Sequence, residues 1–198
     1  MEFAKLDRND ADVYGLKYDY GSIMHYGELS CSTNRRPTMI AIDRRYQKTM
    51  GSEMISFTDI FMINEHYGCN GETCKHFAPP GCGQYVIAME KRQTLECRLG
   101  FGAGVRDQFG VCNYMIRAPE GRKIEVEVQS VSHGYDYGGC PRGGVEVKAQ
   151  KNQKLTGYRF CSTKGSEGPI VSKSNPLPVI IFSKVGTIAT TVVYRYID

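Results

Sequence analysis

The stretch Ile124-Glu125-Val126-Glu127-Val128-Gln129 alternates apolar and polar residues along its whole length. Successive side chains of a strand point to opposite faces of a sheet, so this alternation predicts a half-buried strand. Four more stretches read as strands, separated by Gly and Pro turns: 145–149, 158–161, 178–182 and 188–196. The stretch 145–149 repeats the half-buried alternation, whereas 178–182 reads as a more fully buried strand. Short strands divided by such turns predict an antiparallel β-sandwich in the C-terminal part of the chain.

A single helix is predicted in the N-terminal part, over residues 57–67. Ser56 is a suitable N-cap, Asp59 stands three residues later as in a capping box, and Gly68 follows the last apolar residue. Residues 1–55 show weak periodicity and predict loops with short turns. Turn-forming residues fill 69–83, where we place a domain boundary.

Composition excludes two classes of partner. The 198 residues carry 25 Lys and Arg against 21 Asp and Glu, a net charge of +4 that is too small and too dispersed to indicate nucleic-acid binding. The longest apolar run, residues 179–182, is far too short to span a membrane.

Eight cysteines, at positions 31, 69, 74, 82, 97, 112, 140 and 161, contain no C-x-x-C pair. Their even number and long spacing favour disulfides, and hence a secreted chain, over a structural zinc cluster. Residues 1–8 nevertheless contain no apolar signal segment. The expectation is that the N-terminal part of a longer protein is missing.

The string Tyr18-Asp19-Tyr20-Gly21-Ser22-Ile23-Met24-His25-Tyr26-Gly27 closely resembles the Met-turn of the astacin family of zinc metalloendopeptidases. The resemblance covers about residues 2–69 and implies the C-terminal part of a peptidase domain, residues 1–69. It implies that Met24 lies beneath the zinc and that Tyr26 occupies a zinc-ligand position. A thioether suits an apolar floor, and a phenol beside a metal can ligate it or donate to an oxyanion.

The zinc motif of that family, H-E-x-x-H-x-x-G-x-x-H, is absent from this sequence. The four histidines, His25, His66, His76 and His133, have neither the spacing nor the adjacent glutamate. The expectation is therefore that no catalytic residue is present, that zinc does not bind tightly to this chain alone, and that the chain alone is inactive.

Residues 83–198 resemble a CUB domain, a jelly-roll-like sandwich used for binding. The resemblance rests on Cys112-Asn113-Tyr114-Met115-Ile116-Arg117, on Gly157-Tyr158-Arg159-Phe160-Cys161 and on the turn at Asn175. Many CUB domains bind calcium through an acidic cluster. Here Pro141-Arg142-Gly143-Gly144 has no carboxylate where one is expected, so calcium is not predicted, and Asp136 is read as a solvated loop residue.

The CUB resemblance implies that Cys140 pairs with Cys161, and that Cys112 pairs with Cys82 or Cys97. Cys82 is preferred because Cys82-Gly83 resembles the start of the domain. Residues 70–82, with Cys74, resemble a vestigial EGF-like linker. The pairing of the other cysteines stays open.

Together these features predict a mainly β chain: a CUB-like antiparallel sandwich preceded by a loop-rich, one-helix remnant of a metzincin catalytic domain. The predicted function is that of a fragment of a secreted zinc metalloendopeptidase, acting on an extracellular protein or peptide. The alternative is a non-catalytic CUB binding module. Residues 1–69 are expected to be loosely ordered or to rest their helix on the sandwich, which is expected to fold without them.

Overall fold

The structure is a computed structural model, and it describes residues 6–7, 9–68, 83–100, 102, 104–132, 136–162 and 168–198. The N-terminal segment contains the short 3-10 helix η1 (Arg44–Tyr46) and the helix α1 (Phe57–Tyr67). The strands are β1 (Tyr85–Ile87), β2 (Gln93–Leu99), β3 (Val105–Arg117), β4 (Lys123–Val131), β5 (Gly143–Val147), β6 (Tyr158–Phe160), β7 (Ile170–Val171), β8 (Leu177–Val185) and β9 (Ile188–Ile197).

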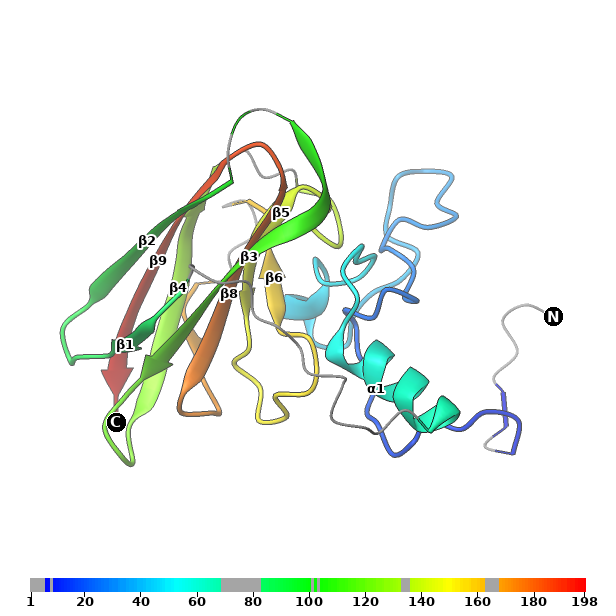
Figure 1. The fold of residues 1–198 in the computed structure, drawn as a ribbon, viewed down its shortest axis with the longest axis horizontal. Helices are drawn as coiled ribbons and strands as arrows, with labels where there is room; N and C mark the ends of the chain where they lie inside the picture. Colours follow the sequence, from blue (N-terminus) through cyan, green and yellow to red (C-terminus); the bar gives the residue numbers. More distant parts are fainter. Residues whose placement is uncertain are drawn as a thin grey trace.

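The strands form two sheets that pack face to face (Figure 1). One sheet has the order β1-β3-β8-β5-β6 and the other has the order β2-β9-β4-β7. All strand pairs are antiparallel except β1 and β3, which are parallel. The mainly β prediction with one helix is confirmed, and the parallel pair makes the first sheet a mixed one.

The core of the sandwich is formed by the inward-facing residues of both sheets, which alternate with outward-facing residues along strands such as β4. Ile124, Val126 and Val128 of β4 are buried, as the alternation predicts. They pack in one cluster with inner residues of the opposite sheet, among them Val145 and Ile181.

β5 departs from the predicted half-buried pattern, because all five of its residues are buried. Glu146 is only 4% exposed. The N-terminal segment covers the outer face of β5 and β6, so polar residues of these strands are buried beneath it. Met54 of that segment packs beside Phe182 on this outer face.

The predicted helix 57–67 is confirmed as α1. Ser56 and Asp59 form a reciprocal capping box, and Gly68 ends the helix in the left-handed conformation. The helix contacts the sandwich at its edge, where the Lys154 ammonium lies 5.1 Å from the centre of the Phe61 ring. Thr58 is its one buried residue, Ile63 and Tyr67 are exposed, and α1 lies to one side of both sheets (Figure 1). The loops before it make further contacts with the sandwich, through Asp19, Thr49 and Ser52.

Candidate functional site

The 18–27 turn, the segment from Tyr18 to Gly27, displays its two family-motif residues on the surface. The side chains of Met24 and Tyr26 are 84% and 75% exposed. His25 between them is held by hydrogen bonds: its Nε2 shares one with the Tyr18 hydroxyl, and its Nδ1 lies 2.6 Å from the Tyr26 carbonyl oxygen. Burial, and then the nearby Tyr20, raise the pKa of Tyr18 above its usual value.

Apolar side chains gather beside this turn. Tyr18, His25 and Met39 line two adjoining hollows, one of which also reaches Ile42 and Met50. Ile42 is 97% exposed, and Ile23 and Ile40 are exposed as well. A contiguous apolar patch on a protein surface marks an interaction site more often than a solvated face. The turn therefore presents a face suited to cover by further protein or by an apolar ligand.

The described residues do not fit a zinc site by themselves. No group of three His, Cys, Asp or Glu side chains lies close enough to hold a metal anywhere in the described ranges. His25 is engaged with Tyr18 and with the Tyr26 backbone. Of the predicted metal-site residues, the structure brings Tyr26 and Met24 to one exposed surface, and the described residues supply no partner ligand there.

Asp19, at the start of the turn, ties it to the sandwich. Its carboxylate accepts hydrogen bonds from the Thr156 backbone N–H, at 3.2 and 3.3 Å, and from the Thr156 hydroxyl at 3.2 Å. It also accepts from the Thr58 hydroxyl at 2.6 Å and from the Gly21 N–H at 3.0 Å. One carboxylate thus joins the turn, the first turn of α1 and the loop before β6.

A run of tyrosines extends from the turn to β6. Tyr20 stacks on Tyr46 with ring centroids 4.8 Å apart, and Tyr46 packs on Tyr158 at 4.6 Å. The Tyr158 hydroxyl donates to Asp43 at 2.9 Å. Burial, followed by the charges and rings around it, raises the pKa of Tyr46 well above its usual range. Tyr46 therefore stays neutral, and its ring packs between those of Tyr20 and Tyr158.

Thr49 closes the open edge of β6. Its side chain is fully buried, donates to the Gly157 carbonyl at 3.1 Å and accepts from the Arg159 N–H at 3.2 Å. β6 is the last strand of its sheet, so these two backbone groups would otherwise face outward without a strand partner. A single hydroxyl supplies both missing bonds.

A buried ion pair lies under the same segment. Arg159 and Glu146 are adjacent on β6 and β5, with Nε and Oε2 3.0 Å apart, and the two residues are 3% and 4% exposed. Glu146 also accepts from the Gly157 N–H, and Arg159 donates to the Ser52 hydroxyl at 2.6 Å. Buried charges are stable only with such full satisfaction, and the N-terminal Ser52 is part of it.

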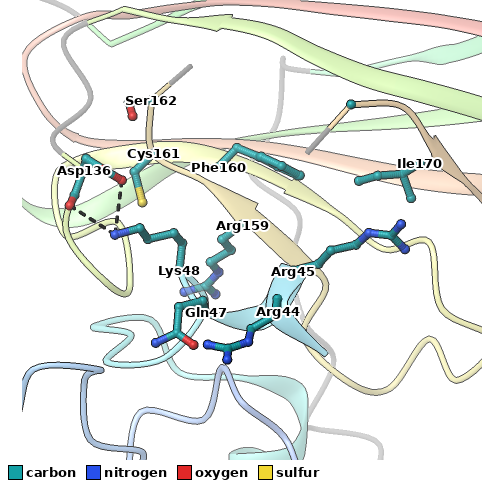
Figure 2. A pocket seen from close by; sticks show the side chains of 11 residues that line it. Arg44, Arg45, Gln47, Lys48, Asp136, Arg159, Phe160, Cys161, Ser162 and Ile170 are labelled. Carbon is teal, nitrogen blue, oxygen red and sulfur yellow. Dashed lines mark hydrogen bonds and ion pairs between the residues drawn. The ribbon is translucent and has the colours of Figure 1, made fainter. Parts of the chain in front are cut away.

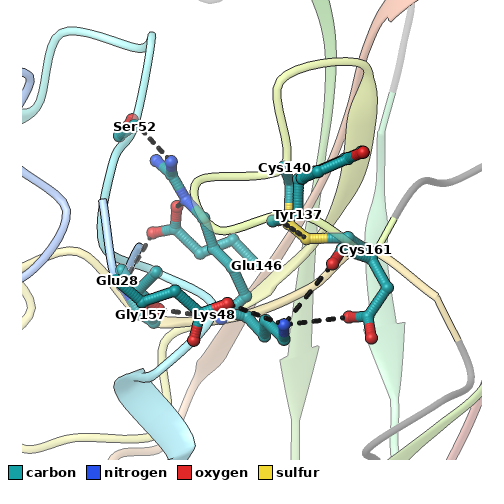
Figure 3. The surroundings of a disulfide bond; sticks show 11 residues. Glu28, Lys48, Ser52, Tyr137, Cys140, Glu146, Gly157 and Cys161 are labelled. Atoms are coloured by element: carbon teal, nitrogen blue, oxygen red, sulfur yellow. Dashed lines mark hydrogen bonds and ion pairs between the residues drawn. A yellow bond between two sulfur atoms is a disulfide. The ribbon is translucent and has the colours of Figure 1, made fainter. Parts of the chain in front are cut away.

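Lys48 links the segment to the loop before the disulfide (Figure 3). Its ammonium lies 2.9 Å from a carboxylate oxygen of Glu28 and 3.3 Å from one of Asp136. Asp136 is an exposed loop carboxylate, as expected, and it also forms a surface ion pair with the N-terminal segment. The N–H of Gly139, the residue before Cys140, donates to the Lys48 carbonyl at 2.9 Å.

We call the boundary between the N-terminal segment and strands β5 and β6 the seam. A cavity of about 140 Å³ opens at the seam (Figure 2). Arg44, Arg45 and Lys48 line it from the N-terminal segment, and Arg159 and Phe160 line it from β6. The cations do not converge on one point: Figure 2 shows Arg44 and Arg45 pointing apart. Lys48 and Arg159 are already paired with carboxylates.

The cysteines follow the implied pairing where the structure describes them. Cys140 and Cys161 are joined in a disulfide, with Cα atoms 5.1 Å apart. Cys112 is disulfide-bonded, and Cys97 is a buried free thiol, so the alternative pair of Cys97 with Cys112 is excluded. Cys82 lies outside the described residues, as do Cys69 and Cys74, the linker 70–82, His76 and His133. Gly83, the residue after Cys82, lies against Asn113, the residue after Cys112.

Sequence reasoning found Met24 and Tyr26 but missed the residues that hold their turn in place. Asp19 and Thr156 are 137 residues apart, and Thr49 and Arg159 are 110 apart. No local pattern links such pairs. The one available signal was the presence of polar Glu146 and Arg159 within otherwise apolar strands.

Comparison with known proteins agrees with both parts of the chain. Residues 1–68 match the astacin peptidase family. The zinc metalloproteinase nas-31 of Caenorhabditis elegans is 36% identical over 98% of this chain, and nas-29 of the same organism is 30% identical over 100% of it. The chain spans 37% and 43% of the lengths of these two curated relatives. Together with the sandwich, these matches show the resemblance to the C-terminal part of an astacin-like peptidase.

Solved CUB structures also align with the sandwich. The CUB1-EGF-CUB2 domain of human MASP-1/3 aligns with 59% of this chain and 43% of its own, with 18% sequence identity and a TM-score of 0.41. The MASP-1 CUB2 domain bound to Ca2+ aligns with 55% of this chain and 96% of its own, with 20% identity and a TM-score of 0.35.

Proposed function

We propose that this chain is the C-terminal part of a secreted, astacin-like zinc metalloendopeptidase. The observation that carries the proposal is the 18–27 turn, which belongs to the astacin match and presents Met24 and Tyr26 on an exposed apolar face. In the intact enzyme the upstream half of the catalytic domain covers the apolar side chains beside the turn, among them Ile40 and Ile42, and leaves the Tyr26 hydroxyl open to substrate. Burial of large apolar side chains there yields about 1.5–3 kcal/mol each, which is enough to drive such an association.

Tyr26 supplies the phenol of the proposed active site, and Met24 would pack as an apolar group beneath a metal held by the upstream ligands. The histidine ligands and the glutamate base of the family are not in this sequence. Peptide-bond hydrolysis therefore requires the polypeptide that contains them. The exposure of Tyr26 leaves its hydroxyl free to reach a substrate carbonyl, where a phenol donates to developing negative charge.

The extracellular location is supported by the Cys140–Cys161 disulfide and by the proteinase relatives. No helix in the described ranges is long and apolar enough to cross a membrane. The partner is a protein or peptide of the extracellular space.

A non-catalytic binding module is the second candidate. It is favoured by the exposed apolar side chains beside the 18–27 turn, among them Ile40 and Ile42, which form a face suited to a protein partner. In that case the exposed apolar face binds a protein partner, and the peptidase segment serves to complete the sandwich.

The test is the polypeptide extended at its N-terminus with the residues encoded upstream. Zinc content after dialysis and cleavage of a quenched fluorescent peptide are measured for the extended and the 198-residue chains. We expect one zinc and peptidase activity in the extended chain alone. Tyr26→Phe should lower its kcat by roughly 10- to 1,000-fold, whereas Tyr85→Phe, an exposed tyrosine on β1, should not.

An upstream reading frame without the H-E-x-x-H motif would favour the binding module. Full activity in the Tyr26→Phe variant would refute the role given to that phenol. Stoichiometric zinc in the 198-residue chain would contradict the assignment of the metal ligands to the upstream residues.

A further inference from the structure

The 18–27 turn is held at both ends by the sandwich, while its middle is exposed. At its start, Gly21 is buried against the Thr156 side chain, and a Cβ atom at position 21 would overlap that side chain. At its end, Gly27 lies on Gly51, and Gly51 lies in turn on Gly139 of the sandwich. Met24 and Tyr26 stand between these two attachment points.

Asp19 connects Thr156 of the sandwich to the backbone of the turn. Its carboxylate is fixed from outside by the N–H and hydroxyl of Thr156, and it accepts the Gly21 N–H from within the turn. The Asp19 carbonyl then accepts the Ser22 N–H. The orientation of Asp19 therefore sets the backbone path that leads to Met24.

Every backbone N–H of residues 21–25 has an acceptor. The acceptors come from three residues: Asp19 for Gly21 and Ser22, Ser22 for Met24 and His25, and Asp59 for Ile23. Asp59 is in turn fixed by the capping box with Ser56. The turn is thus a small hydrogen-bonded unit, and the pair of Asp19 with Thr156 is its hydrogen-bonded link to the sandwich at the end that leads into Met24.

We propose that the sandwich positions the proposed active-site turn, and that Thr156 is the positioning residue through which it does so. The C-terminal domain then helps to fix the position of the active-site turn and is more than a separate binding domain joined by a linker. The catalytic consequence rests on the proposed function, but the positioning itself is a property of this chain.

The test uses amide hydrogen exchange of the 198-residue chain, without metal or substrate. Thr156→Val keeps the side-chain shape and the backbone donor but removes the hydroxyl bond to Asp19. Thr156→Ser keeps that hydroxyl. Lys151→Ala is the control, since it changes an exposed residue of the same loop.

We expect residues 21–25 to exchange about tenfold faster in Thr156→Val, because a hydrogen bond to a charged acceptor contributes that much to protection. Thr156→Ser and Lys151→Ala should exchange as the unmodified chain does, and β8 should stay protected in all of them. Gly21→Ala should loosen the same residues, because its Cβ would displace Thr156.

Unchanged exchange at residues 21–25 in Thr156→Val would overturn the proposal. Equal acceleration of the turn and of β8 would also overturn it, because Thr156 would then contribute to global stability and not to the position of the turn. The readout needs no peptidase activity, so its failure and the failure of the proposed function are separate results.

Discussion

Thr49→Val is the substitution that most sharply perturbs the joint between the N-terminal segment and the sandwich. Valine has the shape of threonine, so the fully buried site keeps its packing. The change removes the acceptor of the Arg159 N–H and the donor to the Gly157 carbonyl, both of which are buried. Each orphaned buried group costs about 1–3 kcal/mol, so we expect a loss of about 2–4 kcal/mol.

For a chain of this length, that loss lowers Tm by about 5–15 °C. Urea unfolding followed by circular dichroism should show a lower midpoint with an unchanged slope. Thr49→Ser retains the hydroxyl and should lose only about 1 kcal/mol, the contribution of one buried methyl group. Thr94→Val, at an exposed site on β2, should change stability by less than about 0.5 kcal/mol. The reasoning is refuted if Thr49→Val unfolds like Thr94→Val, or if Thr49→Ser is as unstable as Thr49→Val.

The disulfide, the edge of β6 and the Asp59 carboxylate each give a further test. Replacing Cys140 and Cys161 together by Ser opens a 21-residue loop and should cost about 3 kcal/mol, measured as a lower Tm under oxidising conditions; an unchanged Tm would argue against the bridge. Residues 83–198 expressed alone should self-associate on a sizing column, because the outer edge of β6 loses its cap; a stable monomer with the Tm of the whole chain would contradict this. Burial would raise the pKa of Asp59, but hydrogen bonds from four donors, the Ser22 hydroxyl, the Ile23 N–H and the N–H and hydroxyl of Ser56, outweigh burial and lower it. This carboxylate therefore contributes stability that is present above about pH 4 and is lost as the pH falls through its folded pKa; an equally steep acid transition in Asp59→Asn would show otherwise.

Local chemistry made much of the fold predictable. The helix 57–67 was readable because its cap, first-turn carboxylate and terminal glycine act within a few residues of one another. β4 was readable because alternation reports which of its faces is buried. The short strands β1 and β7 have only three and two residues, too few to show a period.

The sequence did not predict that the N-terminal segment covers the outer face of β5 and β6. The strand pattern assigned Glu146 and its neighbours one exposed face, because alternation cannot show that another segment covers it. The way in which residues 1–69 attach to the sandwich could not be predicted for the same reason. The sequence drew attention to the apolar residues of the helix, whereas Asp19, Thr49 and Ser52 attach the N-terminal segment to the sandwich through hydrogen bonds.

The site shows the same division. Met24 and Tyr26 were located by a ten-residue motif, and the structure places both on one surface. That Thr156 fixes their turn depends on a contact across 137 residues. One sequence taken by itself does not show that two residues so far apart in the chain are in contact.

The central claim is that the contacts of Thr49 and Lys48 with the sandwich belong to one cooperative unit with the sandwich core, to which the 18–27 turn is attached as a part that can open locally. Native-state hydrogen exchange in rising denaturant tests it directly. The Arg159 and Gly139 amides lie at the seam, bonded to Thr49 and Lys48, while the strand β8 lies in the middle of its sheet. We predict that the seam amides open with the same free energy as those of β8, in a single global step. Seam amides that exchange at a much lower free energy, while β8 stays protected, would contradict the claim and leave the sandwich as an independent domain.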